Sequence, residues 1–558
     1  MNSTSTSTVG TTRFHDLDAL RAFAMLLGIL LHALLSFVEL PVWPAQDLRQ
    51  NSAVYGLIQH AIHGFRMPLF FLISGFFTAM LWRKRGLGGL LRQRAVRILV
   101  PLAVGWVVVW PVMIVVGTWG DASKKELVAG RSGAHGESIQ VIWSAAKRGD
   151  AVGIEKLLKE GANPNGKDPT TGVLPLEWAA LGGHPEAMAI LIEGGAKVDG
   201  RDREGSTALH AAAFLGRSKE VALLLENGAS VIVKNRQGEA PLDTQKHDWR
   251  TVQWLAAALE IEVNRKEVMQ GRKKAAELLL AAGAEPAVPV QDGGVRSQLR
   301  SIVGLWIFGA MMPFFHHLWF LYYLCLLVGI FVLVVLVKKW LGWRIPNRLV
   351  STPMRWLWIF PLTFLAQLFM LQSFGPDTAS GILPWPPKLF YYAVFFGFGA
   401  LCFGKPFFEK EAGKFWVVWF LLAIPIFVTG LYCFEHRGER FILFHPLASL
   451  LAVCYVWLMI FGCIGFFRRF FNAENPTIRY VSDSAYWLYL AHLPLVIAVQ
   501  ILVAGWPLPS LVKLCLVCGA STGILLVIYE WGVRYTFVGA VLNGRKRRDS
   551  SPNPSGTN

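Results

Sequence analysis

Charged side chains are scarce in this chain: Asp, Glu, Lys and Arg make up only 16% of its 558 residues, while 54% are hydrophobic. Such a composition indicates a membrane protein. Acidic residues are the rarer kind, and the formal net charge is +17. A nucleic-acid binder would also be basic, but here the cations cluster in loops between apolar runs, which membrane topology explains better. We therefore expect a lipid bilayer, and no nucleic acid, as a partner.

Two further kinds of signal are missing. The seven cysteines lie within or beside apolar segments, so we expect buried thiols, and neither a disulfide framework nor a metal site. The Ser/Thr-rich start of the chain is followed by an apolar run without a small-residue cleavage site, and further spans come after it. We therefore expect no cleaved signal peptide.

Long apolar runs fill most of the remaining chain. One helical span needs about 20 apolar residues, and ten segments approach this length: 18–40, 53–81, 98–118, 314–337, 354–373, 388–404, 415–433, 441–467, 483–503 and 508–530. The connections on one side of the membrane carry 20 Lys and Arg, and those on the other side carry three. The positive-inside rule then places both termini in the cytoplasm and residues 119–300 on the opposite side.

Residues 119–300 form a different kind of sequence, rich in Ala, Gly, Glu and Lys and without a long apolar run. Related tetrapeptides at 174–177, 207–210 and 240–243 are spaced 33 residues apart. A 33-residue period with Thr-Ala-Leu-His, paired helices and Gly-Ala turns resembles the ankyrin repeat. We expect three to four repeats over residues 138–285, with an interrupted fourth unit whose second helix begins near Gly271.

The ankyrin segment is expected to bind a partner, not to catalyse. Stacked repeats bury one continuous core, which assigns the Leu and Ala positions to structure. His210 belongs to Thr-Ala-Leu-His, where its side chain is expected to bond between neighbouring turns. A protein is the candidate partner, although ankyrin repeats share no common ligand.

Four stretches of the apolar segments carry recognisable motifs. They are LDALRAFAMLLGILLHA at 17–33, HGFRMPLFFLISGFF at 63–77, HHLWFLYYLCLLV at 316–328 and SDSAYWLYLAHLPLV at 482–496. Taken in order, they resemble the acyltransferase 3 family of membrane proteins, and within it the glucan biosynthesis protein C subgroup. The expected fold is all-α, a bundle of about ten transmembrane helices from residues 1–118 and 301–540, with the ankyrin segment inserted and a disordered basic cytoplasmic tail at 541–558.

The resemblance implies an enzyme of the inner (cytoplasmic) membrane. Such proteins take an acyl group from cytoplasmic acyl-CoA, here acetyl-CoA or succinyl-CoA as co-substrate with no bound cofactor. They place it on a hydroxyl of an extracytoplasmic carbohydrate such as a glucan, polysaccharide or glycolipid. Two alternatives stay open: a transporter or flippase for a polar solute or glycan, and a non-catalytic membrane scaffold that uses the ankyrin domain.

Arg21 and His32 are the candidate catalytic residues, because titratable side chains within a span face a protein interior or a wet cavity. Eleven residues make about three helical turns, so both side chains share one face of the first span. Histidine suits a base near neutral pH or a covalent acyl carrier. The resemblance matches the pair to the family's Arg-x10-His spacing, and Arg21 would bind a CoA phosphate or a carboxylate.

The second span supplies two candidate substrate-binding residues. His63 and Arg66 stand at its outer end, on or near one helical face. Arg66 would meet an anionic acyl tail or a sugar hydroxyl. Ser74 and Gly75, further along the span, are expected to allow close packing of helices.

Four more candidate substrate-binding residues lie in the fourth and ninth spans. His317 and Trp319 begin the fourth span, a position that suits acceptor binding because sugars stack on aromatic rings. Asp483 is expected near the cytoplasmic entrance, where it would cap the start of the ninth span. His492, about three turns deeper, is expected to orient a partner.

Overall fold

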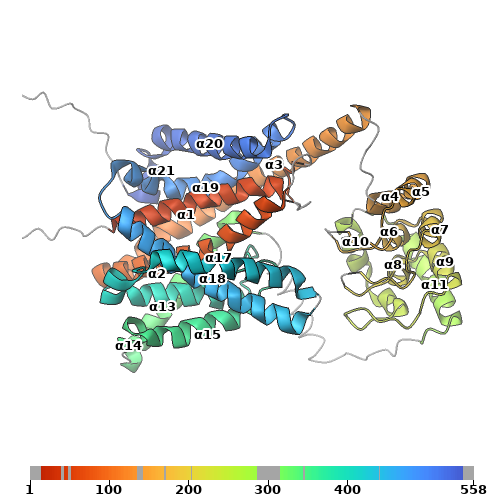
Figure 1. Cartoon of the computed structure of the whole chain (residues 1–558), viewed down its shortest axis with the longest axis horizontal. Coiled ribbons are helices and arrows are strands. Elements are labelled where there is room, and N and C mark those ends of the chain that lie inside the picture. Colours follow the sequence, from red (N-terminus) through yellow and green to blue (C-terminus); the bar gives the residue numbers. More distant parts are fainter. Residues whose placement is uncertain are drawn as a thin grey trace, which may run out of the picture. The chain divides into compact units, whose positions relative to one another are not determined.

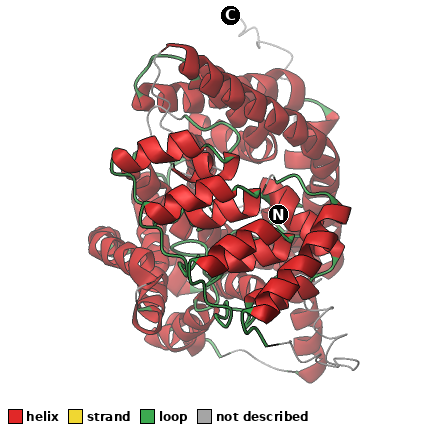
Figure 2. Cartoon of the chain, turned by 90° about the vertical axis from the view of Figure 1, so that its right-hand side faces the viewer, coloured by secondary structure: helices red, strands yellow, loops and turns green. Residues whose placement is uncertain are grey.

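The computed structural model describes residues 14–38, 43–47, 52–134, 142–168, 171–202, 204–259, 261–285, 309, 314–342, 346–438 and 440–544. The predicted tail lies outside these residues from 545 onward, but its first three residues belong to a helix. Figure 2 shows helices and loops, and no strand in the part of the chain that is described, so the all-α prediction is confirmed. The chain forms two compact units: Met1–Leu127 with Val295–Asn558, and Val128–Gly294.

The first unit is a bundle of long helices (Figure 1). Its α-helices are α1 (His15–Leu34), α2 (Ala53–Arg94), α3 (Val100–Ala134), α13 (Trp319–Leu341), α14 (Arg348–Ser351), α15 (Trp356–Gln367), α16 (Pro386–Cys402), α17 (Trp416–Glu435), α18 (Phe441–Phe470), α19 (Pro476–Ala504), α20 (Ser510–Ile528) and α21 (Phe537–Asn543). Short 3-10 or π turns are η1 (Leu35–Phe37), η2 (Ala95–Leu99), η4 (His316–Leu318), η5 (Pro353–Arg355), η6 (Phe407–Glu411), η7 (His436–Gly438) and η8 (Tyr529–Val533). Helix α1 packs along α19, α2 along α16 and α17 along α18.

Seven helical segments of the described residues are long and apolar enough to cross a membrane, which makes the protein a multi-pass membrane protein. One of them, Ala53–Gly120, is 68 residues long and contains two of the predicted spans. Helices α15 and α16, with 12 and 17 residues, fall short of a full crossing. The count of ten spans therefore stays a prediction. Helix α3 also continues to Ala134, past the predicted start of the insertion at residue 119.

Close packing at Gly75 is confirmed, and its partner is α16. A Cβ atom added to Gly75 would lie 1.9 Å from the carbonyl oxygen of Phe396, and one added to Gly399 would lie 1.9 Å from that of Leu72. The backbones of α2 and α16 therefore touch directly, as small residues permit between membrane helices.

This contact predicts a stability difference between two alanine variants of α16. Gly399→Ala is expected to lower the free energy of unfolding in detergent by about 1–3 kcal/mol, because the two helices must move apart. Gly397→Ala is the matched control, since its Cβ would have no heavy atom within 4 Å. Thermal unfolding of the purified protein measures both, and equal midpoints would contradict the direct backbone contact.

The second unit is a stack of paired helices. They are α4 (Ile142–Arg148), α5 (Ala151–Lys159), α6 (Pro175–Gly182), α7 (Pro185–Glu193), α8 (Ala208–Leu215), α9 (Ser218–Glu226), α10 (Trp249–Ala258) and α11 (Arg265–Ala281), with the 3-10 turn η3 (Pro241–Lys246). Apolar side chains of successive pairs form one core. His210 has no catalytic surroundings: Nδ1 lies 2.9 Å from the Thr207 hydroxyl and Nε2 lies 3.0 Å from the Glu239 carbonyl oxygen, as predicted.

The prediction for the fourth unit was wrong in one respect. Its second helix, α11, begins at Arg265 and not near Gly271. The side chain of Asn264 accepts a hydrogen bond from the Lys266 amide and caps this earlier start. Gly271 lies inside the helix, where its Cβ would meet the carbonyl oxygen of Gly216, so it marks a close contact between repeats.

Candidate functional site

Two polar cavities adjoin each other inside the helical bundle. The first, here called the histidine cavity, has a volume of about 420 Å³, and its polar or aromatic lining includes His32, Trp43, His63, Arg66, His316, His317, Trp319 and His492. The second, the arginine cavity, has a volume of about 470 Å³, and its charged lining is Asp18, Arg21, Arg94, Arg97 and Asp483. Four residues line both cavities and form a wall between them, the partition: Met25, Phe70, Phe320 and Tyr489.

The same three layers recur along four of the helices that build the cavities, α1, α2, α13 and α19. On α1, Arg21 lines the arginine cavity, Met25 belongs to the partition and His32 lines the histidine cavity. The spacing keeps all three side chains on one helical face. Helix α19 has this order from Asp483 through Tyr489 to His492, while α2 and α13 carry it in reverse. Helices α1 and α19 therefore run from the arginine cavity to the histidine cavity, and α2 and α13 run in the opposite direction.

The His32 imidazole lies among aromatic rings of the histidine cavity. Its centroid is 5.2 Å from that of His492, and 6.1 Å from that of Trp43, whose plane is nearly parallel at 7°. The Nδ1 atom of His32 is buried and has no hydrogen-bond partner within the described ranges. The backbone at His32, in contrast, is fixed by hydrogen bonds. The side-chain amide of Gln500 donates to the carbonyl oxygens of His32 and Ala33 at 3.0 and 2.9 Å.

His492 and His317 continue this cluster. Their ring centroids are 5.1 Å apart. His492 Nδ1 lies 2.8 Å from the Tyr489 carbonyl oxygen, and His317 Nε2 lies 3.1 Å from that of Leu490. The other nitrogen of each ring, Nε2 of His492 and Nδ1 of His317, is buried without a partner among the described residues. Three imidazoles therefore keep a ring nitrogen free to exchange a proton.

No three or more His, Cys, Asp or Glu side chains in the described ranges are grouped so that they could hold a metal ion.

Arg66 is the one permanent cation among the described residues of the histidine cavity, and no Asp or Glu lines that cavity. Its Nε is buried without a hydrogen-bond partner, and no ion pair is formed by it in the described part of the chain. Its guanidinium lies against Gly28, where an added Cβ would be 2.4 Å from Nη1. A half-buried guanidinium without an ion pair in the described structure is a site for an anion, because a partner charge offsets its lost hydration.

The other predicted residues of this cavity are held by the surrounding fold. His63 Nε2 lies 2.7 Å from the Pro376 carbonyl oxygen. Trp319 is buried, and its ring packs against Tyr392 and Phe71 with centroids 5.4 and 6.2 Å away. Both residues reach the cavity wall, so the structure brings six of the predicted site residues to one cavity: His32, His63, Arg66, His317, Trp319 and His492.

Arg21 and Asp483 lie in the arginine cavity, apart from the histidines. Arg21 donates to the Ser482 hydroxyl at 2.9 Å and lies 3.5 Å from Asp18. Asp483 does not cap α19, so that expectation was wrong: the helix begins at Pro476, and Asn475 accepts from the amides of Thr477 and Ile478. A proline in the first turn and an asparagine cap explain the earlier start.

Sequence reasoning missed several residues of the two cavities. Arg94 is half-buried, donates to the Thr78 hydroxyl at 2.8 Å and has a buried Nε without a partner in the described residues. In the sequence it is one of the cations between two apolar runs, with nothing to distinguish it from its neighbours. Trp43 comes from a short loop and is fixed by a 2.9 Å hydrogen bond to Gln500. The regular spacing of Arg21, Met25 and His32 was the signal that could have revealed the partition.

Comparisons with known proteins match both units. A family model described as an acyltransferase domain matches residues 14–146 and 278–530, which include all eight predicted site residues. A model of ankyrin repeats in three copies matches residues 142–235. These matches confirm the two resemblances drawn from the motifs.

Curated relatives share a shorter stretch. Proteins named "Glucans biosynthesis protein C" from Salmonella paratyphi B, Salmonella heidelberg and Salmonella agona are each 35% identical over 100 residues. That stretch is 17% of this chain and 24% of each relative. The family match covers more than half of the chain, and the protein therefore belongs to the acyltransferase domain family, as a multi-pass membrane member that also carries ankyrin repeats.

Proposed function

We propose that the protein transfers an acyl group from acyl-CoA to a hydroxyl of a carbohydrate on the other side of the membrane. The observation that carries this proposal is the pair of adjoining cavities, one rich in arginine and one in histidine. Arg21, Arg94 and Arg97 suit the phosphates of CoA, since guanidinium groups bind phosphate oxygens in pairs. The histidine cavity then receives the acceptor hydroxyl.

The proposed reaction is a direct transfer. The acceptor oxygen attacks the thioester carbonyl carbon while its proton passes to the unpartnered nitrogen of His32. The new C–O bond forms, the C–S bond breaks, and the CoA thiolate leaves and takes up a proton. His492, with its ring 5.2 Å from His32, is placed to support the charged imidazole or pass the proton on through a bridging group.

Arg66 favours an acyl group that carries its own carboxylate, such as succinyl, over acetyl. Its guanidinium has no carboxylate partner in the described structure and faces a cavity without acidic lining. A bidentate carboxylate would satisfy it.

The position of Arg66 depends on Gly28. A Gly28→Ala variant is expected to push the guanidinium away, because the new methyl group would lie 2.4 Å from Nη1. A displaced binding group can slow transfer by about 10- to 100-fold. Gly519→Ala on α20 is the control, since its Cβ would meet nothing within 4 Å. Steady-state rates with succinyl-CoA measure the effect, and an unchanged rate would refute this role of Gly28.

The charge pattern of the loops supports an orientation for these steps. With both termini in the cytoplasm, as the positive-inside rule predicts, Arg21 on α1 lies toward the cytoplasmic acyl-CoA and His32 toward the extracytoplasmic acceptor. The ankyrin unit then lies on the extracytoplasmic side of the inner (cytoplasmic) membrane. There the repeats bind a protein partner, which can itself bring the glycan acceptor to the membrane site.

A transporter is the weaker reading. Carriage of a polar solute or glycan needs a polar route, whereas apolar side chains of Met25, Phe70 and Phe320 separate the two cavities. The narrow acyl end of a thioester suits such a wall better than a hydrated sugar does. Unpartnered histidine nitrogens and an unpaired arginine likewise favour chemistry over a purely structural scaffold.

Mass spectrometry of extracytoplasmic glycans tests the proposal. A strain that lacks the gene is expected to export glycans without the acyl group, and the wild-type gene is expected to restore it. Glycans that stay inside the cell in the deletion strain would instead support transport. Unchanged acylation in a deletion strain without a redundant enzyme would contradict the proposed function.

A further inference from the structure

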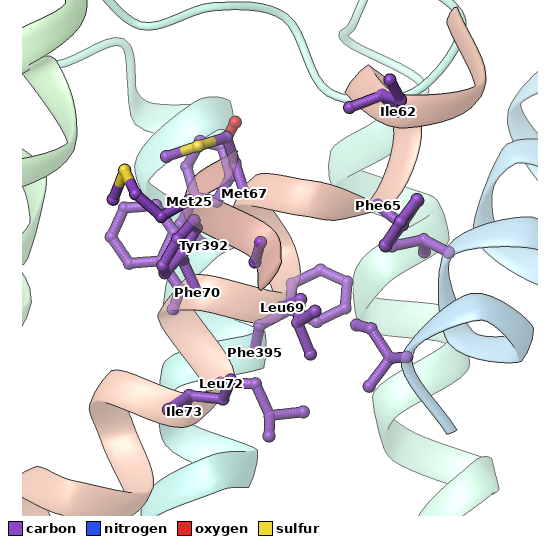
Figure 3. Close-up of a cluster of buried hydrophobic side chains, with 14 of the residues drawn as sticks. Met25, Ile62, Phe65, Met67, Leu69, Phe70, Leu72, Ile73, Tyr392 and Phe395 are labelled. Carbon is purple, nitrogen blue, oxygen red and sulfur yellow. The ribbon is translucent and has the colours of Figure 1, made fainter. Parts of the chain in front are cut away.

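The partition is one side chain thick on every helix that contributes to it. Met25 comes from α1, Phe70 from α2, Phe320 from α13 and Tyr489 from α19. Figure 3 shows Met25 and Phe70 gathered beside Met67 and Tyr392. Beyond this layer, the linings of both cavities include charged or titratable side chains among apolar ones. Two cavities with titratable side chains in their linings are therefore separated by a thin, mostly apolar wall.

The members of the wall are held with different firmness. The Tyr489 hydroxyl donates to the His317 carbonyl oxygen at 2.6 Å, so this side chain is anchored. Phe320 is held by ring contacts, to Phe71 at 4.9 Å, to Phe70 at 5.6 Å and to Tyr489 at 5.9 Å between centroids. Met25 has an unbranched side chain, which adapts its shape readily. Tyr489 is therefore fixed by a hydrogen bond, while Met25 and Phe320 are held by packing alone in the described structure.

From this arrangement the geometry points to the partition as the acyl-selecting passage of the protein: the acyl end of the thioester reaches the histidine cavity between Met25 and Phe320, and their bulk decides which acyl groups pass. This inference rests on the proposed function. The apolar wall also keeps water of one cavity from that of the other, which protects the thioester from hydrolysis. Neither the wall nor its selectivity adds a covalent step to the transfer.

Two opposing requirements explain why apolar side chains stand here. An open polar channel would leak protons and ions across the membrane, while a thick apolar plug would keep the thioester from the base. One layer of adaptable side chains blocks hydrated solutes, because burying polar groups without partners costs free energy. The same layer lets a narrow acyl group through by rotation of a side chain, and Arg66, one helical turn from Phe70 on α2, is the partner for a succinyl carboxylate that has passed.

The first test changes the size of the wall. Phe320→Ala is expected to raise the transfer of bulkier acyl groups, such as hexanoyl and isobutyryl, relative to the natural short group by about tenfold or more in kcat/KM, because each methylene in a pocket is worth about 10-fold or more. Met25→Ala is a second variant with the same expected direction. Phe331→Ala is the control, since this residue lies on the same helix and lines neither cavity.

The second test does not depend on activity. A cysteine is placed in the histidine cavity by Ser380→Cys, or in the arginine cavity by Ser74→Cys, and membrane vesicles are treated with a small anionic methanethiosulfonate. Peptide mass spectrometry reads the modification at each new cysteine. Each is expected to react from one face of the membrane only, and Phe320→Ala is expected to add reaction from the opposite face.

The possible results separate this inference from the proposed function. Wild-type transfer with an unchanged acyl preference in Phe320→Ala and Met25→Ala would overturn the selecting role and leave the acyltransferase function standing. If both cysteines react from both faces of the membrane in proteins with Met25 and Phe320 unchanged, the partition is not a barrier. No transfer by the wild-type protein from any acyl-CoA would overturn the proposed function, and acyl selection with it, even if the cysteines reacted from one face.

Discussion

His32→Ala is expected to lower the rate of acyl transfer by about 10²- to 10⁴-fold, the usual contribution of a general base. The loss should fall on kcat, because the ring accepts a proton only during the reaction. Folding should be little affected, since Nδ1 makes no hydrogen bond in the described structure and Gln500 holds the main chain through carbonyl oxygens. Rates with purified protein, acyl-CoA and a glucan oligosaccharide measure the change.

The matched control is His60→Ala. His60 lies on α2, near the Phe434 ring at 6.2 Å, and lines neither cavity. It should keep the wild-type rate. Acid-quenched samples also test the direct transfer, which predicts that no acyl group is attached to His32 at any time. An active His32→Ala protein would refute its role as base, and an acylated His32 would replace the direct transfer with a two-step one.

Arg66→Gln is expected to reduce succinyl transfer by about 10- to 100-fold, because hydrogen bonds to charged groups contribute about 1.5–3 kcal/mol. Acetyl transfer should fall much less, since an acetyl group has no carboxylate for the guanidinium to bind. Arg66→Lys should restore only part of the succinyl rate, because a lysine keeps the charge but lacks the planar fork.

The comparison of the two donors decides what Arg66 binds. Equal losses for succinyl-CoA and acetyl-CoA would show that the guanidinium acts on the reacting carbonyl oxygen and not on the acyl carboxylate. Unchanged rates with both donors would remove Arg66 from the site. Helical content and detergent stability, measured on the same samples, separate these outcomes from misfolding.

Local patterns in the sequence predict much of this protein. The 33-residue period predicts the ankyrin repeats, and the length of the apolar runs predicts most of the long helices. Both features are formed by residues close together in the sequence. Titratable side chains within the apolar runs, together with the family resemblance, led to the histidines and Arg66 that line one cavity. A capping rule applied to Asp483 failed, since the stronger capping signal, Asn475 followed by Pro476, begins eight residues upstream.

What the sequence hides is the assignment of each residue to a cavity. Arg21 and His32 share one face of α1, yet Met25 between them belongs to a wall whose other members come from three distant helices. Trp43 reaches the site from a loop, and Gln500 fixes it from α19. Such relations arise from packing of remote segments, which periodicity along one helix does not contain.

Transfer across a sealed membrane tests the central claim most directly. The protein is reconstituted into vesicles that enclose a glucan oligosaccharide, and labelled succinyl-CoA is added outside. Molecules with the arginine cavity outward are expected to acylate the enclosed oligosaccharide, and vesicles with His32→Ala are expected to leave it unlabelled. Labelling only when donor and oligosaccharide are on the same side would contradict transfer through the two adjoining cavities.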